Sequence, residues 1–370
     1  MSKRIALATT MALLSGTFLA GAARADIVIG IGTATTGAVA ALGQQSVLGA
    51  EQAVKDINAK GGVLGQQLVL KVGDEACDPK QAVAVANRFV SDGVVAVVGH
   101  LCSGASIAAS DVYTEEGIVM VSPTATSPAL TEKARENIFR VCGRDDQQGV
   151  VSGQYIAEKF KGKPVAIVDD KQAYGKGLAD VVEKTLKDAG AQVAYRGSVT
   201  AGERDFASLV TALKDKKVEA VYYGGYHPEL GLIARQSREM GLQAQFIAGD
   251  GLNNAEYWSI TGPAGAGTLY TDSPSAAGNP AAAQLVKAFE QAKQDAGNFA
   301  FYSYAAVQVI AEGLKKAGEA DGKKLATALH GNSFDTVVGQ IQFDKKGDVV
   351  KPAYVLYEWR DGKNVQLSSK

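Results

Sequence analysis

The 370-residue chain has few of the side chains on which most metal and catalytic centres depend. It contains only three histidines and three cysteines. None of them has the C-x-x-C or H-x-x-x-H spacing that is typical of zinc sites, although His100, Cys102 and Cys77 can nominally be grouped as ligands. A disulfide and a structural histidine are the preferred interpretation, so the sequence predicts no metal.

Glycine-rich phosphate-binding loops are also missing. The segment "GIGTATTG" has Gly30 and Gly32 after a predicted strand, but Thr35 stands where a dinucleotide-binding fingerprint needs its third glycine. No G-K-[ST] motif of a nucleotide-binding loop occurs. The segment is interpreted as an ordinary strand-to-helix turn, and no cofactor is predicted.

The chain lacks an excess of positive charge. It carries 38 basic and 39 acidic residues, and without its first 25 residues it would carry 35 basic and 39 acidic ones. A mildly acidic surface without a basic cluster argues against nucleic acid as a partner.

Beyond the first 25 residues, no apolar stretch is long enough to span a bilayer. Those 25 residues combine two basic residues, the apolar run "IALATTMALLSGTFLAG" and the small-x-small motif Ala23-Arg24-Ala25, as secretory signal peptides do. We expect cleavage after Ala25, which would leave an exported chain of 345 of the 370 residues. A retained membrane anchor is the alternative, but the run is short and Arg24 follows it at once.

Export affects how the three cysteines are interpreted. In an oxidising compartment, Cys77, Cys102 and Cys142 are expected to form one disulfide and to leave one free thiol.

Short β-branched runs alternate with amphipathic helical stretches in two successive series, which indicates an α/β fold with parallel sheets in two lobes. In the first series, strands are expected at "DIVIGIG", "QQLVLKVGDE", "VVAVVGH" and "GIVMVSP", with helices over about 48–60, over about 80–90 and at "SGASIAAS". In the second series, strands are expected at "KPVAIVDD", "AQVAYRGSV", "EAVYYGG" and "AQFIAGDG", with helices over about 177–189, 205–215 and 229–240. Gly61-Gly62 and Asp78-Pro79 provide helix stop and start signals.

Hydroxyl groups follow two neighbouring strands of the first series. Ser103 begins a helix, whose free backbone N–H groups and dipole favour an anion, and "SPTATSP" offers Thr124 and Thr126 after the next strand. In doubly wound sheets, ligands bind beyond the carboxyl ends of the strands. These donors therefore suit a carboxylate, with ordinary caps and turns as the alternative.

A ligand that also carries an ammonium group would need an acidic partner. Asp250 in "FIAGDGLN" ends a strand of the second series, and Tyr226 in "YYGGYHPE" ends another. With an ordinary pKa of about 3.9, Asp250 is expected to be ionised at neutral pH. The alternative is that Asp250 only forms a turn.

A serine nucleophile is the enzymatic alternative. Ser103 lies between a strand and a helix, but Leu101 stands where a nucleophile elbow has glycine. His100 is too close to Ser103 in sequence to be the usual distant base. The chain is therefore predicted not to be an enzyme.

Several long segments resemble the periplasmic leucine/isoleucine/valine-binding proteins of bacterial ABC importers. The resemblance is carried by "GAEQAVKDINAKGG", "ACDPKQAVAVAN", "GHLCS", "VTAGERDF", "VYYGGYHPE" and "SYAA", and it covers nearly the whole chain after residue 25. It implies a type I periplasmic binding protein with two doubly wound parallel-sheet lobes joined by three crossovers. The implied lobes are residues 26–144 plus 274–352 and residues 145–273 plus 353–370.

The resemblance also implies a function. A monomer in the periplasm would close its two lobes around an amino acid, a branched-chain or other aliphatic one, and deliver it to the cognate ABC permease in the inner membrane. A ligand-sensing receptor with the same fold is the alternative.

Carried over by motif, Ser103 and Thr126 would hold the ligand carboxylate, and the Thr124 carbonyl and Asp250 would hold the ammonium. The full implied ligand-binding set is Leu42, Leu101, Cys102, Ser103, Thr124, Thr126, Tyr174, Tyr226, Asp250 and Phe299. The family's disulfide would fall at Cys77–Cys102, and Cys142 would be free. The sequence departs from the family at Asp250, where other members have glutamate, and at Leu42 and Thr124, where they have tyrosine and alanine. These departures leave the preferred side chain open.

Overall fold

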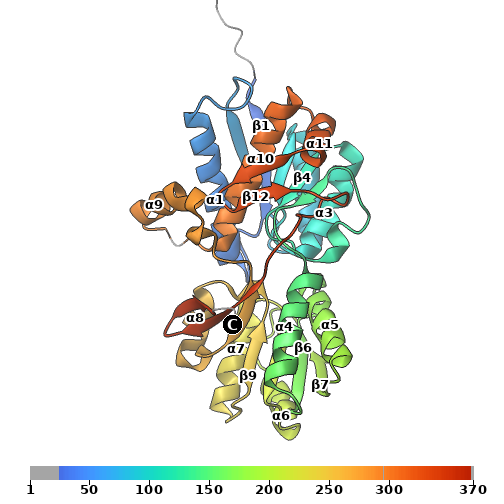
Figure 1. Cartoon of the computed structure of the whole chain (residues 1–370), viewed down its shortest axis with the longest axis vertical. Coiled ribbons are helices and arrows are strands. Elements are labelled where there is room, and N and C mark those ends of the chain that lie inside the picture. Colours follow the sequence, from blue (N-terminus) through green and yellow to red (C-terminus); the bar gives the residue numbers. More distant parts are fainter. Residues whose placement is uncertain (1–24, 295, 368–370) are drawn as a thin grey trace, which may run out of the picture.

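Two separate β-sheets organise the molecule, one in each of two lobes that follow each other along its long axis (Figure 1). The computed structural model describes residues 25–294 and 296–367. Nearly all of the expected signal peptide, residues 1–24, therefore lies outside the described residues. In the described part, no helix has the length and apolar character needed to cross a membrane.

The first sheet contains five parallel strands in the order β2-β1-β3-β4-β5. Its elements are, in chain order, β1 (Ile27–Thr33), α1 (Ala40–Ala59), β2 (Leu68–Asp74), α2 (Pro79–Ser91), β3 (Ala96–Gly99), α3 (Ser103–Glu116), β4 (Val119–Ser122) and β5 (Ile138–Arg140). In the register, Val98 pairs with both Ile31 and Val121. The carboxyl ends of β3 and β4 are therefore neighbours, which brings the start of α3 next to the loop after β4.

The second sheet contains seven strands in the order β14-β13-β10-β9-β8-β6-β7. Its elements are α4 (Asp145–Lys159), β6 (Val165–Asp169), α5 (Ala173–Asp188), β7 (Val193–Ser198), α6 (Ala207–Asp215), β8 (Ala220–Gly224), α7 (His227–Glu239), β9 (Gln245–Ala248), α8 (Glu256–Thr261), β10 (Leu269–Asp272), β13 (Val355–Arg360) and β14 (Lys363–Gln366). Strands β6 to β10 are parallel, and the sequence analysis predicted β6 to β9 but not the strand β10.

An antiparallel hairpin, which the sequence analysis did not predict, completes the second sheet. Strand β13 pairs antiparallel with β10 and then with β14. Asp361 and Gly362 form its turn with φ angles of 46° and 79°. Positive φ at both positions is the geometry for which Asp-Gly is preferred in two-residue hairpins.

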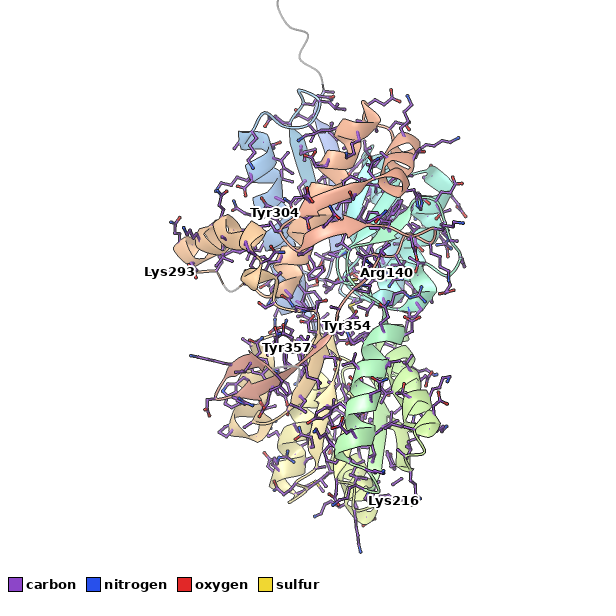
Figure 2. The ribbon with its side chains drawn as sticks, in the orientation of Figure 1. Arg140, Lys216, Lys293, Tyr304, Tyr354 and Tyr357 are labelled. Atoms are coloured by element: carbon purple, nitrogen blue, oxygen red, sulfur yellow. A yellow bond between two sulfur atoms is a disulfide. The ribbon has the colours of Figure 1, made fainter. Side chains whose placement is uncertain are left out.

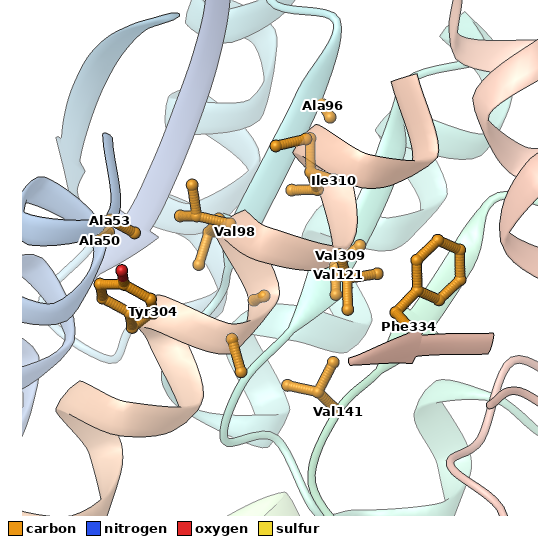
Figure 3. Packing of buried hydrophobic residues seen from close by; sticks show 14 of the residues in the cluster. Ala50, Ala53, Ala96, Val98, Val121, Val141, Tyr304, Val309, Ile310 and Phe334 are labelled. Atoms are coloured by element: carbon orange, nitrogen blue, oxygen red, sulfur yellow. The ribbon is translucent and has the colours of Figure 1, made fainter. Parts of the chain in front are cut away.

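The remaining helices belong to the first lobe. They are α9 (Ala283–Ala292), α10 (Asn298–Ala317) and α11 (Gly322–Gly331), and the hairpin β11 (Ser333–Thr336) and β12 (Gly339–Gln342) follows them. Helix α10 packs on the first sheet, where Val309 and Ile310 lie against Val98 and Val121 (Figure 3). The first lobe is thus built from two distant parts of the chain.

Two helices begin earlier than predicted. Helix α1 starts at Ala40 instead of near Leu48, and α5 starts at Ala173 instead of near Gly177. Glycine usually weakens a helix, but here it permits close contact, because a Cβ at Gly43 would overlap the Ala34 carbonyl. Packing against the rest of the lobe therefore outweighs local helix propensity.

The predicted helix start at Asp78-Pro79 is confirmed. The Asp78 side chain accepts hydrogen bonds from the backbone N–H groups of Lys80 and Gln81, at 2.8 and 2.9 Å, and Pro79 is the first residue of α2.

Three chain segments connect the two sheets. They follow β5, follow β10 and precede β13, and in Figure 1 the last of them runs from the first lobe down to the C-terminal hairpin. The residue limits that the sequence analysis gives to the lobes stay a prediction.

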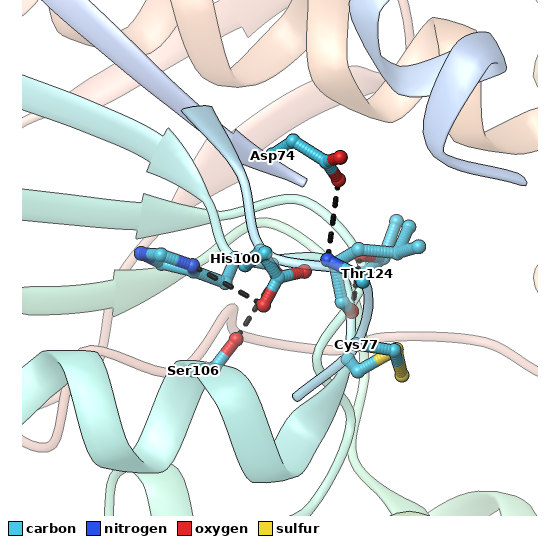
Figure 4. The surroundings of a disulfide bond; sticks show 9 residues. Asp74, Cys77, His100, Ser106 and Thr124 are labelled. Carbon is cyan, nitrogen blue, oxygen red and sulfur yellow. Dashed lines mark hydrogen bonds and ion pairs between the residues drawn. A yellow bond between two sulfur atoms is a disulfide. The ribbon is translucent and has the colours of Figure 1, made fainter. Parts of the chain in front are cut away.

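The disulfide implied by the resemblance is confirmed. Cys77 lies in the turn after β2, Cys102 directly precedes α3, and their Cα atoms are 5.4 Å apart (Figure 4). The bond closes a loop of 25 residues and fixes the start of α3 against the turn after β2. Cys142 is free and buried.

We expect the double variant Cys77→Ser/Cys102→Ser to lose about 3–4 kcal/mol of unfolding free energy, because the opened 25-residue loop gains entropy in the unfolded chain. Urea unfolding with and without reductant measures this loss. Cys142→Ala is the matched control, since it should lose as much stability on reduction as the wild-type protein. A double variant as stable as the oxidised wild-type protein would contradict the prediction.

Candidate functional site

Residues of both lobes meet around a small cavity of about 250 Å³. It is lined by Leu42, Leu101, Ser103, Thr124, Tyr174, Tyr226, Asp250, Gly251 and Phe299. An adjoining cavity of about 300 Å³ shares Thr124, Asp250 and Phe299 with it and also contains Thr126. Of the ten predicted site residues, only Cys102 lines neither cavity, and its sulfur is bonded to Cys77.

The first lobe contributes hydrogen-bond donors to this cavity. Ser103 is the first residue of α3, so the unpaired N–H groups of the helix start lie beside it. Its hydroxyl oxygen accepts a hydrogen bond from the Ser127 N–H at 3.2 Å, and the Thr124 hydroxyl donates to the Leu101 carbonyl at 2.9 Å. The loop after β4 is thereby fastened to the start of α3.

Several backbone groups of that loop are already hydrogen-bonded. The Ala125 N–H donates to the Ser122 hydroxyl at 3.0 Å, and the Thr126 carbonyl accepts from the Asp145 N–H at 2.9 Å. Within the described part of the chain, the Thr124 carbonyl and the Thr126 N–H make no hydrogen bond. These are an acceptor and a donor, which suit an ammonium group and a carboxylate respectively.

The second lobe contributes Asp250, which follows β9. Its carboxylate accepts hydrogen bonds from the Tyr174 hydroxyl at 2.8 Å and from Gln148 Nε2 at 3.0 Å. The Tyr174 ring packs on the Tyr226 ring with centroids 5.0 Å apart. Only 7% of Asp250 is exposed, so two neutral donors hold a nearly buried acid.

Burial has a large effect on this acid. It raises the pKa of Asp250 to about 6, and the hydrogen bond from Tyr174 opposes part of the rise. It also raises the pKa of Asp272 to about 8, with a further contribution from the negative charge of Asp250. At neutral pH the two coupled carboxyl groups therefore carry about one negative charge between them. A ligand ammonium is attracted by that charge.

Several residues near the site were missed by the sequence analysis. Gln148 brackets Asp250, since its Oε1 also accepts the Asp250 N–H at 3.4 Å. Asp272 accepts hydrogen bonds from Asn253 and Asn298, at 2.6 and 3.1 Å, and lines the adjoining cavity. Asp145 is fully buried, and burial followed by the charge of Asp250 raises its pKa well above the usual range. No motif in the sequence marks these positions, because they converge from distant segments.

The serine-nucleophile alternative finds no geometric support. Ser103 makes no hydrogen bond to a histidine within the described residues. His100 Nε2 lies 2.9 Å from the Tyr113 hydroxyl, and its Nδ1 faces Glu75 at 3.5 Å. The His100 carbonyl accepts from Ser106, next to the disulfide (Figure 4). His100 is therefore part of a buried structural cluster. In the same described part, no three His, Cys, Asp or Glu side chains are grouped to hold a metal ion.

Comparison with known sequences gives a consistent result. The sequence model of the periplasmic binding protein family matches residues 26–364. Leu/Ile/Val-binding protein homolog 1 of Brucella melitensis biotype 1 is 47% identical over 357 residues, which cover 95% of this chain and 96% of that protein. Leu/Ile/Val-binding protein BraC3 of Rhizobium johnstonii is 44% identical over 358 residues, covering 96% and 98% of the two chains.

Solved structures share the fold. The leucine binding protein LivK from Thermotoga maritima matches with a TM-score of 0.86 at 28% identity, over 92% of this chain and 98% of that one. The branched-chain amino acid transporter substrate binding protein LivJ from Streptococcus pneumoniae, solved in complex with isoleucine, matches with a TM-score of 0.83 at 27% identity, over 92% and 100%. The predicted two-lobed fold class is therefore confirmed.

We expect Asp250→Asn to stabilise the ligand-free protein at pH 7.5 by roughly 1–3 kcal/mol. The folded-state pKa of about 6 lies above the ordinary value of 3.8, so wild-type stability falls as pH rises between these values, whereas the amide has no charge to bury. Urea unfolding at pH 4.5 and 7.5 tests this, with the exposed turn variant Asp361→Asn as control. A variant without a stability gain at pH 7.5 would show that burial of the charged Asp250 carboxylate does not destabilise the folded protein.

Proposed function

The chain belongs to the periplasmic binding protein family, and we propose that it captures an aliphatic L-amino acid, above all a branched-chain one, between its lobes. One observation carries this proposal most directly. A nearly buried acid, Asp250, faces a cluster of hydroxyl and backbone groups at Ser103, Thr124 and Thr126 across adjoining small cavities. This arrangement matches the two opposite charges of an amino acid.

The carboxylate of the ligand would bind to the first lobe. The N–H groups at the start of α3 and the Ser103 hydroxyl are donors there, and the Thr126 N–H is a further one. The helix dipole adds to the attraction for a negative group. Each hydrogen bond to a charged group contributes about 1.5–3 kcal/mol.

The ammonium group would bind to Asp250 and to the Thr124 carbonyl. Tyr174 and Gln148 keep the Asp250 carboxylate in place without neutralising it. The other walls, Leu42 and Phe299 among them, are apolar. The small size of this cavity favours a small aliphatic side chain. Relatives named Leu/Ile/Val-binding proteins support the same ligand class.

Closure of the lobes would complete the site, because Asp250 and Tyr226 come from one lobe and Ser103 from the other. Periplasmic binding proteins usually capture their ligands by closing two lobes about a hinge. The closed form would then dock on an ABC permease of the inner membrane. In this proposal the mature protein starts after Ala25, works in the periplasm as a monomer and catalyses no reaction.

Saturating L-leucine, L-isoleucine or L-valine should raise the melting temperature by several degrees. A ligand at about 1,000 times its Kd adds ~4 kcal/mol to the stability of the folded state. The measurement is a thermal scan after co-purified ligand has been removed by partial unfolding and dialysis. N-acetyl-L-leucine, which lacks the ammonium group, is the matched control and should give little shift. Absence of a shift with all three amino acids would contradict the proposed ligand class.

Affinity for L-leucine should be constant between pH 7 and 8 and should fall up to about tenfold per pH unit below pH 6. The reason is that Asp250, with a pKa near 6 in the ligand-free protein, must lose its proton to face the ammonium. Asp250→Asn should weaken binding about 10- to 100-fold, the loss of one charged hydrogen bond, and remove the pH dependence. Calorimetry across this pH range measures both effects.

The matched control for this titration is Asp170→Asn. Burial raises the pKa of Asp170 to about 7, yet Asp170 lines neither cavity. That variant should keep the wild-type pH profile. If the Asp250→Asn variant kept the wild-type affinity for L-leucine and its pH dependence, a residue other than Asp250 would have to bind the ligand ammonium.

A further inference from the structure

Arg140 is the largest fully buried side chain among the described residues. It is the last residue of β5, where the chain leaves the first sheet toward the second lobe. Figure 2 labels it in the first lobe, above Tyr354 and close to the junction of the lobes. It lines neither of the two cavities, so the proposed ligand contacts do not explain why a buried charge is present.

The Arg140 guanidinium holds the two carbonyl groups on either side of Thr126. Its Nη1 donates to the Ala125 carbonyl at 2.7 Å, and its Nη2 donates to the Ser127 carbonyl at 2.9 Å. In a planar trans peptide, the C=O and the following N–H point in opposite directions. An Ala125 carbonyl that points at Arg140 therefore directs the Thr126 N–H away from Arg140.

The direction of that N–H matters because the Thr126 N–H makes no hydrogen bond within the described residues and is free to bind a ligand. Thr126 lines the cavity that adjoins the ligand cavity, together with Asp250. A loop in which this peptide rotated would exchange a donor for an acceptor at the position proposed for the ligand carboxylate. Arg140 thus sets the direction of the Thr126 N–H without lining either cavity itself.

Other groups hold the guanidinium in place. Arg140 Nε lies 2.7 Å from Asp348 Oδ1, and Thr131 accepts from Nη2 at 2.8 Å and donates to Asp348 at 2.7 Å. Asp348 lies near the start of the segment that leads to β13, and its second oxygen accepts from Arg144 at 2.7 Å. Two segments that connect the lobes are thereby tied to the loop at Thr126.

We propose that Arg140 is a positioning residue for ligand affinity, which aims the Thr126 N–H at the carboxylate of the bound amino acid by holding the Ala125 and Ser127 carbonyls. This inference rests on the proposed function. The planar fork of arginine can reach two carbonyls and a carboxylate at fixed angles, whereas a lysine ammonium is a single flexible centre. Arg140→Lys therefore keeps the charge and loses the geometry.

The test compares Arg140→Lys with Arg238→Lys. Arg238 is a matched control, because its Nη1 and Nη2 also donate to two carbonyls, those of Leu242 and Ala244, at 2.8 and 3.0 Å, but in the second lobe away from both cavities. Three quantities are measured for each: Kd for L-leucine, the melting temperature without ligand, and hydrogen exchange over residues 122–130. We expect a lower melting temperature for both variants. Only Arg140→Lys should raise Kd, by 10- to 100-fold, and speed exchange in that segment.

Two results would overturn the inference. One is an Arg140→Lys protein whose Kd stays within threefold of wild type, which would make Arg140 purely structural. The other is a raised Kd with unchanged hydrogen exchange over residues 122–130, which would show that Arg140 does not affect ligand affinity through this loop. If Arg140→Lys does not fold, Thr131→Val removes one anchor of the same guanidinium and should raise Kd at least threefold, and an unchanged Kd there would also overturn it. Wild-type protein that binds no aliphatic amino acid would instead refute the proposed function itself.

Discussion

The negative charge of Asp250, buried with no cationic partner at hydrogen-bond distance among the described residues, is the feature on which the proposed site depends. Two neutral groups, Tyr174 and Gln148, hold its carboxylate, and burial raises its pKa to about 6. A charge in such a position is unfavourable until a cation arrives. The structure therefore favours ligands that bring an ammonium group and disfavours ligands that bring a second anion.

The fold brings hydrogen-bond donors for the proposed ligand carboxylate opposite Asp250 by using both lobes. Parallel strands end at the same edge of a sheet, so β3 and β4 bring the start of α3 beside the loop that contains Thr124 and Thr126. The Cys77–Cys102 disulfide fixes the first residue of that helix. Strand β9 of the other sheet ends at Ala248, two residues before Asp250. Donors and acid thus come from separate lobes, and the distance between them is set by how the lobes close.

Sequence reasoning reached the parts of this arrangement that depend on local pattern. Alternation of strands and helices located the parallel sheets, and strand ends indicated Ser103 and Asp250. It did not reach Gln148 or Asp272, because these come close to Asp250 only through the packing of α4 and β10 within the second lobe. It also placed the start of α1 too late, since the glycine at position 43 is required by contact with Ala34 and is not a helix break. The Asp361-Gly362 hairpin did have a local signal, the Asp-Gly pair, which was not used.

The segments that connect the lobes carry charged groups of their own. Asp145 begins α4 directly after the first segment, Asp272 ends the strand before the second, and Asp348 lies near the start of the third. Closure, as proposed, would therefore change the surroundings of several acids at once. In the proposed mechanism, opening returns water to Asp250 and lowers the free energy of its ionised form, which favours the open state when no ligand is bound. In the closed state, a bound ammonium group offsets the unfavourable free energy of the buried Asp250 charge. In this mechanism, the charge that is proposed to bind the ligand also makes closure depend on the ligand, because a ligand shifts the two states only through its different affinity for each.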